Sequence, residues 1–286
     1  MDSLAPKPAS TAADKTDDKQ AALRRRYGAA LPPAGPWNDT IQALLDHRSV
    51  RGYKPDALPE GTLETLIAAA ASAATSSNMQ WWSAVAIADP ATKKALAEVA
   101  GNQKHIEECP LYIAFVTDMS RNARISAQEK VDFECMPWLE TFLVASIDAA
   151  LAAQNAVVAA ESLGLQTVYI GAMRNDPVRV AKLLGLPDGA FVVFGLCVGY
   201  PTEKAAGEVK PRLPQSMVLH RERYDATGEA AALATYNEEM KKFSQRHELQ
   251  AGTWTQRVLN RLGPIKSMNG REKMRAALKS LGFEIR

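Results

Sequence analysis

Two short basic segments carry the side chains of this sequence that best suit a charged ligand. The first, HRSVR at residues 47–51, places an imidazole, two guanidinium groups and a hydroxyl within five positions. The second, EVKPRLPQ at residues 208–215, holds Lys210 and Arg212 in a stretch that its prolines keep extended, so that both can project toward one side. Such groups suit a phosphate. Taken alone, however, the first segment is more typical of a solvated basic surface, and the prolines of the second would be ordinary in a linker.

The overall charge gives no hint of a polyanionic partner. The 286 residues include 34 basic and 32 acidic side chains, so the net charge is only +2, and we expect neither nucleic acid nor a membrane as partner. Cys109, Cys135 and Cys197 form no CxxC pair, which argues against a disulfide framework or a zinc site and fits a reducing cytoplasm. No run of about 18 apolar residues occurs, so no membrane-spanning segment is expected.

Signatures of several kinds of catalysis are missing. The sequence contains neither the glycine-rich dinucleotide fingerprint nor the P-loop, and neither the HExxH nor the GxSxG pattern. HIEEC at residues 105–109 has side chains that can bind a metal, but no second cluster supports it, so we expect no metal site. The sequence therefore indicates neither hydrolytic nor metal chemistry.

Composition and periodicity divide the chain into three parts that we expect to differ in structure. Residues 1–36, rich in Ala, Pro, Ser, Thr and charge, are expected to form a disordered tail, followed by a core at 37–224. Helices in this core are predicted from Asn38 or Asp39 onward and at 59–73, 90–100, 141–164 and 177–185, and strands at 83–89, 111–118, 167–172 and 191–201. The long helix at 141–164 is apolar on almost every face, so we expect it to be buried all round. Helices and strands interleave, but one long internal helix dominates, so we expect an α+β fold rather than an open doubly wound sheet.

The third part, residues 225–286, reads as amphipathic helices without strands, at 229–248, 253–262 and 271–283. Their apolar stripes need a surface to cover them. We favour a second copy of the chain, which would make this part an arm of a homodimer. The alternative is a lid that packs on the chain's own core.

Five motifs in a fixed order give the sequence a specific resemblance. They are HRSVR at 47–51, GNQKH at 101–105, GLQTVYIGAMRNDP at 164–177, VFGLCVGYP at 193–201 and KPRLP at 210–214. From about Asp39 to the C-terminus, the chain resembles the nitroreductase superfamily, in particular the branch of oxygen-insensitive NADPH nitroreductases and NADPH:FMN oxidoreductases of the flavin reductase P type. The resemblance implies an FMN-binding homodimer with a central, mainly antiparallel sheet, a long buried helix and a C-terminal helical arm that embraces the partner. These three parts would then be a tail, an FMN-binding core and an arm belonging to the same domain.

The resemblance also implies which residues bind the cofactor. The flavin phosphate is expected among His47, Ser49, Lys210 and Arg212, with Arg48 beside the phosphate or the ribityl chain. Arg51 is expected at the pyrimidine edge of the ring and Gln103 at its polar edge. Two further stretches are expected beside the flavin: Tyr169, Ile170, Gly171 and Ala172, and the serine-rich Thr75, Ser76, Ser77 and Asn78.

The function implied is that of an NAD(P)H-dependent oxidoreductase that passes a hydride through FMN, in a ping-pong cycle, to nitroaromatics, quinones or flavins. No side chain is expected to act as a catalytic nucleophile, because the flavin N5 performs the redox step. Two alternatives remain open. One is an enzyme of the same fold dedicated to a single substrate, for example in reductive dehalogenation, and the other is a non-catalytic FMN-binding redox sensor.

The chain departs from the family pattern at two places. Ala172 stands where relatives have a second glycine, so it must tolerate the local backbone conformation. Gln250 and Ala251 stand near the place where relatives carry consecutive arginines for the 2′-phosphate of NADPH, although Arg246 or His247 could substitute. The preference between NADPH and NADH therefore stays open.

Overall fold

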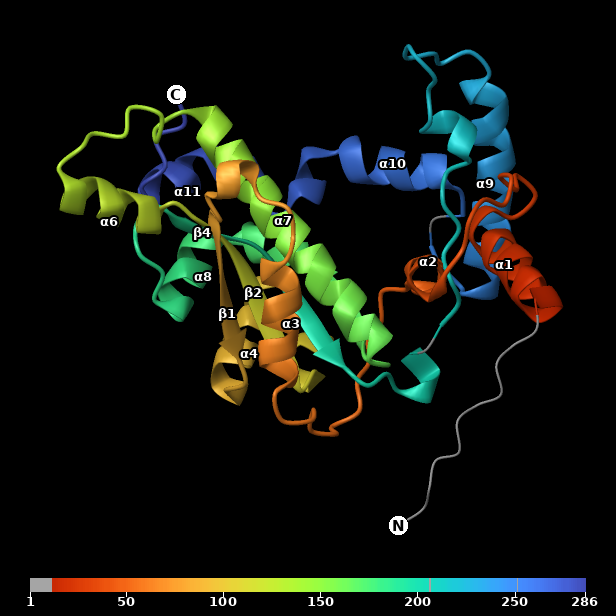
Figure 1. Ribbon diagram of the computed structural model, residues 1–286, viewed down its shortest axis with the longest axis horizontal. Coiled ribbons are helices and arrows are strands. Elements are labelled where there is room, and N and C mark those ends of the chain that lie inside the picture. The colour runs from red at the N-terminus through yellow and green to blue at the C-terminus, as the bar shows by residue number, and fades with distance from the viewer. Residues whose placement is uncertain (1–11, 206, 251) are drawn as a thin grey trace. The chain divides into compact units, whose positions relative to one another are not determined.

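The computed structural model describes residues 12–205, 207–250 and 252–286 (Figure 1). The chain forms two compact units. The helical unit combines the residues up to His47 with Glu208–Pro264, and the sheet unit combines Arg48–Gly207 with Ile265–Arg286. This division differs from the tail, core and arm expected from the sequence, because the helical unit joins segments from both ends of the chain.

The sheet unit is built on four strands, all paired in antiparallel fashion. They are β1 (Trp82–Ile87), β2 (Leu111–Asp118), β3 (Gln166–Ile170) and β4 (Ala190–Gly199), in the order β1-β2-β4-β3. The central pair aligns Leu111 with Val198 and shifts register once, between Phe115 and Val116. The predicted α+β fold with a mainly antiparallel sheet is thus confirmed.

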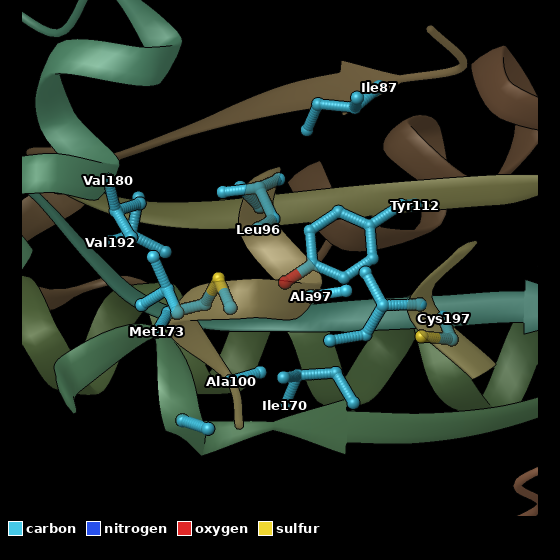
Figure 2. Close-up of a cluster of buried hydrophobic side chains, with 14 of the residues drawn as sticks. Ile87, Leu96, Ala97, Ala100, Tyr112, Ile170, Met173, Val180, Val192 and Cys197 are labelled. Carbon is cyan, nitrogen blue, oxygen red and sulfur yellow. The ribbon is translucent and has the colours of Figure 1, made fainter. Parts of the chain in front are cut away.

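Helices cover both faces of this sheet, and the pleat sends alternate side chains into two cores. One core lies against α4 (Pro90–Val99), α5 (His105–Glu108) and α8 (Pro177–Leu184), and includes Leu96, Tyr112 and Cys197 (Figure 2). The other lies against α3 (Thr62–Ala71) and α7 (Leu139–Ser162). Every residue of β2 is buried because this strand faces a core on both sides. Its continuous apolar run follows from that position.

The long helix α7 has two apolar faces that differ in side-chain size. Its buried face is mostly alanine, which lets the helix approach the sheet closely: Ala145, Ala149, Ala152, Ala153, Ala156 and Ala160. Its opposite face leaves Leu139, Leu143, Ile147 and Leu151 between 44% and 55% exposed. The prediction that this helix is buried all round was therefore wrong for the chain by itself. By length and composition alone α7 could also cross a membrane, contrary to the sequence expectation, although its alanine face packs in the sheet unit's core.

The helical unit contains α1 (Ala12–Tyr27), α2 (Asp39–Asp46), α9 (Glu229–Arg246) and α10 (Trp254–Leu262). The prediction that residues 1–36 are disordered was wrong for Ala12–Tyr27, while residues 1–11 lie outside the described part. Helix α1 forms because Ala22, Leu23 and Arg26 share one face at helical spacing and are all buried. Helix α2 begins as predicted, with the Asn38 side chain accepting a hydrogen bond from the Ile41 N–H at 2.9 Å.

The last residues of the chain belong to the sheet unit rather than to a separate arm. Helix α11 (Met274–Ser280) brings Leu278, Leu281 and Phe283 into a third buried cluster, where the Phe283 ring meets Phe142 edge-on at 5.4 Å. This corrects the expectation of one continuous arm at 225–286 for its final third. The remaining helix of the sheet unit is α6 (Ser120–Glu129). Short 3-10 helices of this unit lie at Ser76–Asn78, Gly171–Asn175, Glu203–Ala205, Ile265–Met268 and Arg271–Lys273, and one at Gln215–Met217 belongs to the helical unit.

The contact between β2 and β4 allows one stability prediction. The Tyr112 ring leans diagonally across the strand pair onto Gly195, where a Cβ would lie 1.8 Å from the phenol oxygen. We expect Gly195→Ala to lower the free energy of unfolding by about 1–3 kcal/mol, the usual cost of overpacking a core. Urea denaturation measures it. Gly35→Ala is the matched control, since no atom lies within 4 Å of its added Cβ. Equal urea midpoints for the two variants would contradict this packing.

Candidate functional site

The sequence-predicted site residues fall in both units. His47, Lys210 and Arg212 belong to the helical unit, and the others belong to the sheet unit.

In the helical unit, the two basic segments meet at the side chain of Arg26. Its guanidinium donates to the Lys210 carbonyl at 2.8 Å and to the His47 carbonyl at 2.9 Å, and it also donates to the Leu45 carbonyl. Arg26 is only 5% exposed. Segments that are some 160 residues apart in sequence are thus held by one planar cation, and the sequence analysis had missed this residue. The only signal was its helical spacing from Ala22 and Leu23.

The Lys210–Arg212 segment is fixed by its main chain and exposes its charged side chains. The Arg212 N–H donates to the Arg26 carbonyl at 2.9 Å, and the Tyr236 hydroxyl of α9 donates to the Pro211 carbonyl at 3.1 Å. Pro211 is buried, whereas Lys210 and Arg212 on either side of it are exposed. This alternation agrees with the extended backbone that the prolines predicted.

Further charged groups of the helical unit gather around the ring of Phe243 on α9. The Lys210 ammonium and the Arg246 guanidinium each lie 5.9 Å from the ring centroid, and the His247 ring stacks on Phe243 at 4.4 Å. Arg246 is also paired with Glu208, to which it donates at 2.9 and 3.2 Å, and this pairing lowers the pKa of the Glu208 carboxyl. The arginine considered for the 2′-phosphate of NADPH therefore already has an anionic partner.

In the sheet unit, the rest of the first basic segment runs beside strand β3. Ser49 forms a parallel bridge with Thr167, and the Val50 N–H donates to the Thr167 carbonyl at 3.0 Å. Val50 is buried, while Ser49 and Arg51 are exposed and alternate with it. Arg48 has its Nε atom buried without a hydrogen-bond partner among the described residues. An unpartnered guanidinium nitrogen fits a site that takes an anion.

The charge of Arg51 acts on His105 of the GNQKH motif. The pKa of His105 is lowered, first because burial disfavours the imidazolium and second because the Arg51 guanidinium opposes a second positive charge. Gln103 of the same motif donates from its amide to the Ala100 carbonyl at 2.9 Å, which ties it to the end of α4. Two predicted site segments are thus coupled electrostatically within the sheet unit.

At the end of β3, the predicted stretch turns from strand into a 3-10 helix at Gly171. Tyr169 faces α7, where its hydroxyl donates to the Gln154 side chain at 3.4 Å, and Ile170 is buried on the opposite face. A Cβ on Gly171 would meet the Arg174 guanidinium at 3.2 Å. Ala172 is buried and does not have a positive φ, so its Cβ is tolerated where relatives carry glycine.

The serine-rich stretch is organised by Asp148 of α7. This buried carboxylate accepts from the Thr75 hydroxyl at 2.5 Å, from the Ser76 N–H at 3.1 Å and from the Trp81 N–H at 3.3 Å. Between them, Ser77 and Asn78 have φ of +49° and +56°, an unfavourable conformation for residues with a Cβ. The hydrogen bonds of Asp148 thus hold a strained loop of predicted site residues.

Among the residues that the structure describes, no group of three histidine, cysteine or acidic side chains could hold a metal ion. What the described residues offer instead is cations, hydroxyls and main-chain donors, the groups that bind a phosphate or a polar heterocycle.

The environment of His105 predicts a pH dependence. Its folded-state pKa lies below the usual value of about 6.5, so on acidification the unfolded chain takes up a proton first. Stability should therefore be complete above about pH 6.5 and fall below it, by at most about 1.4 kcal/mol per pH unit. Urea midpoints between pH 5 and pH 8 measure this slope. We expect His105→Gln to flatten it. The same slope in that variant and the wild type would contradict the assignment to His105.

Comparisons with known proteins agree with this geometry. Residues 44–200 match the model of the nitroreductase family, and residues 210–286 match that of the nitroreductase family C-terminal domain. The NADPH-flavin oxidoreductase of Vibrio harveyi is 35% identical over 79% of this chain and 91% of its own length. The FMN reductase (NADPH) of Bacillus subtilis is also 35% identical, over 78% and 91%.

A solved structure gives the same result for the fold. The structure of NfrA2 from B. megaterium superposes with a TM-score of 0.81 at 36% identity, and covers 87% of this chain and all of that one. Matches at this identity extend over both units. The chain therefore belongs to the nitroreductase family.

Proposed function

We propose that the protein is an FMN-dependent oxidoreductase that takes hydride from NADPH or NADH. The observation that carries this proposal is the meeting of the His47 and Lys210 segments on Arg26, because it brings together the main chains of the two basic segments to which the family resemblance assigns the flavin phosphate. The printed names of the relatives, NADPH-flavin oxidoreductase and FMN reductase (NADPH), support the same cofactor and donor.

The residues present fit FMN. Its phosphate would be held by His47, Ser49, Lys210 and Arg212, and the buried, unpartnered Nε of Arg48 supplies a donor for the phosphate or the ribityl chain. Arg51 and Gln103 would bind the polar edges of the ring. The remaining predicted contacts are Ser76, Ser77, Asn78, Tyr169, Ile170, Gly171 and Ala172.

When bound, FMN supplies a ring that accepts hydride from one substrate and gives it to the next. The chain's own contribution is orientation and electrostatics. Arg51 is exposed, and its charge already lowers the pKa of neighbouring His105, so it can stabilise negative charge on a reduced ring. We propose a ping-pong cycle in which nitroaromatics, quinones or free flavins are the acceptors.

The pairing of Arg246 with Glu208 bears on the choice of donor. A 2′-phosphate would compete with the carboxylate for this guanidinium, so Arg246 contributes less to NADPH binding than an unpaired arginine would. We therefore propose that NADH is used as well as NADPH. Free thiols at Cys109, Cys135 and Cys197 fit the reducing cytoplasm in which such an enzyme would work.

An anaerobic titration of the purified protein tests the function. We expect a yellow protein whose flavin absorbance is bleached by about one molecule of NADPH per flavin, and also by NADH, since each donor carries one hydride. Reoxidation by a quinone or a nitroaromatic compound should then restore the colour. A colourless protein that takes up no FMN would contradict the cofactor, and a bound flavin that neither donor reduces would favour a redox sensor.

We also propose that the protein is a homodimer, on the evidence of two uncovered apolar faces. One is the α7 row Leu139, Leu143, Ile147 and Leu151, and the other is on α10, where Leu259 and Leu262 are 63% and 77% exposed. Large contiguous apolar faces of this kind mark protein interfaces. A second copy of the chain would bury both, in agreement with the arm that the sequence predicted for 225–286.

Charge placed on the α7 row should separate the subunits. We expect the wild type to elute with twice the mass of one chain in size-exclusion chromatography with light scattering. Ile147→Glu combined with Leu151→Glu should shift it to one chain, because burying two carboxylates at an apolar interface is costly. Ile125→Glu on α6 is the matched control, since Ile125 is similarly exposed outside this row. An unchanged mass in the double variant would place the interface elsewhere.

A further inference from the structure

Helix α1 contacts the candidate phosphate site although it lies outside the ranges that match the family. The family models match residues 44–200 and 210–286, whereas α1 spans Ala12–Tyr27. Even so, Arg26 of this helix binds the main chain of both basic segments. The chain therefore adds an element of its own to a region that it shares with its relatives.

The Arg26 side chain holds two segments of the main chain together through hydrogen bonds. The side chain donates to carbonyls at Leu45, His47 and Lys210, while its own carbonyl accepts the Arg212 N–H at 2.9 Å. A guanidinium is planar and rigid, so carbonyls bound to the same group are held at a fixed separation. Arg26 reaches His47 and Lys210 through their main-chain carbonyls, so these bonds fix the course of the chain. The Arg212 guanidinium also donates to the Lys210 carbonyl, at 3.2 Å.

Two further contacts seat α1 in the helical unit. The Arg25 guanidinium pairs with Asp46 of α2 at 2.8 Å. Just past the end of α1, Gly28 has φ of +57°, and a Cβ there would come within 2.6 Å of Glu239 on α9. The helix therefore packs tightly between elements that precede and follow the two basic segments.

We propose that α1 is a positioning element for the flavin phosphate, and that Arg26 acts through the main chain of His47 and Lys210. Holding both segments in place before binding removes an entropic cost that the ligand would otherwise bear. The inference rests on the proposed function, because it takes FMN as the ligand. It makes Arg26 a positioning residue that does not itself touch the cofactor.

A positioning role for the phosphate differs measurably from a general structural role. Riboflavin has the same ring and ribityl chain as FMN but lacks the phosphate. Loss of Arg26 should therefore weaken FMN and leave riboflavin unaffected, whereas a general loosening of the protein would weaken both. The ratio of the two dissociation constants is the decisive quantity.

The experiment compares full-length apoproteins by titration of flavin fluorescence. We expect Arg26→Met to raise the dissociation constant of FMN at least about tenfold, which corresponds to about 1.4 kcal/mol, with that of riboflavin within about twofold. Arg26→Lys should give an intermediate loss, since an ammonium cannot reproduce the fork of the guanidinium. Arg24→Met is the matched control: it removes the same charge from an exposed position of the same helix and should change neither constant.

Each other outcome has a defined meaning. A wild type that binds neither flavin would overturn the proposed function itself. A wild type that binds FMN, together with an Arg26→Met variant that binds it equally well or loses both flavins alike, would overturn only the inference. Circular dichroism checks folding. If Arg26→Met is unfolded, the ratio of the FMN and riboflavin dissociation constants in Arg26→Lys decides the question. If Arg26→Lys is unfolded too, Arg26 is a general structural residue and the proposal is wrong.

Discussion

The hydrogen bonds of the Arg26 guanidinium to main-chain carbonyls are the interaction on which the geometry of the basic segments depends. A buried cation is costly unless its donors are satisfied, and here carbonyls at Leu45, His47 and Lys210 accept from it. These acceptors belong to the backbone, so the bonds fix the course of the chain in both segments. Lys210 and Arg212 are exposed. Cations held close together repel each other, and an anion bound among them would relieve that repulsion.

Much of the sheet unit could be predicted from the sequence because its signals are local. The run LYIAFVTD coincides with β2, since a strand that faces a core on both sides must be apolar throughout. The cap at Asn38 and the turn into α8 after Asp176 likewise depend on neighbouring residues only. The disorder predicted for residues 1–36 was wrong for α1 because it rested on average composition rather than on a local pattern. The mean composition of residues 1–36 is polar, and the short inward face of α1 is lost in that mean.

In the candidate site, too, only the features that depend on local sequence could be predicted. Residue types identified the two basic segments, and their family resemblance suggested a common ligand. The residues that hold such segments in place were not predictable, because their partners lie far away in the chain. Arg26 binds Lys210 across 184 positions, and Asp148 binds Thr75 across 73. No periodicity or spacing records a pairing of that kind. No sequence signal identified Asp148 as the residue that organises the serine-rich stretch.

Helix α7 was correctly predicted to be a long apolar helix, but its surroundings in the chain were not. Its residues are apolar on both faces, and periodicity alone does not say which face packs within the chain. Side-chain size does separate them. Alanines such as Ala149 and Ala156 line the face toward the sheet, where the backbone must come close, and larger residues such as Leu143 and Ile147 line the other. Large aliphatic side chains gain most from burial and fill holes in a partner surface. A helix with one small and one large apolar face is therefore suited to join its own sheet to another subunit, and the proposed dimer would use that difference.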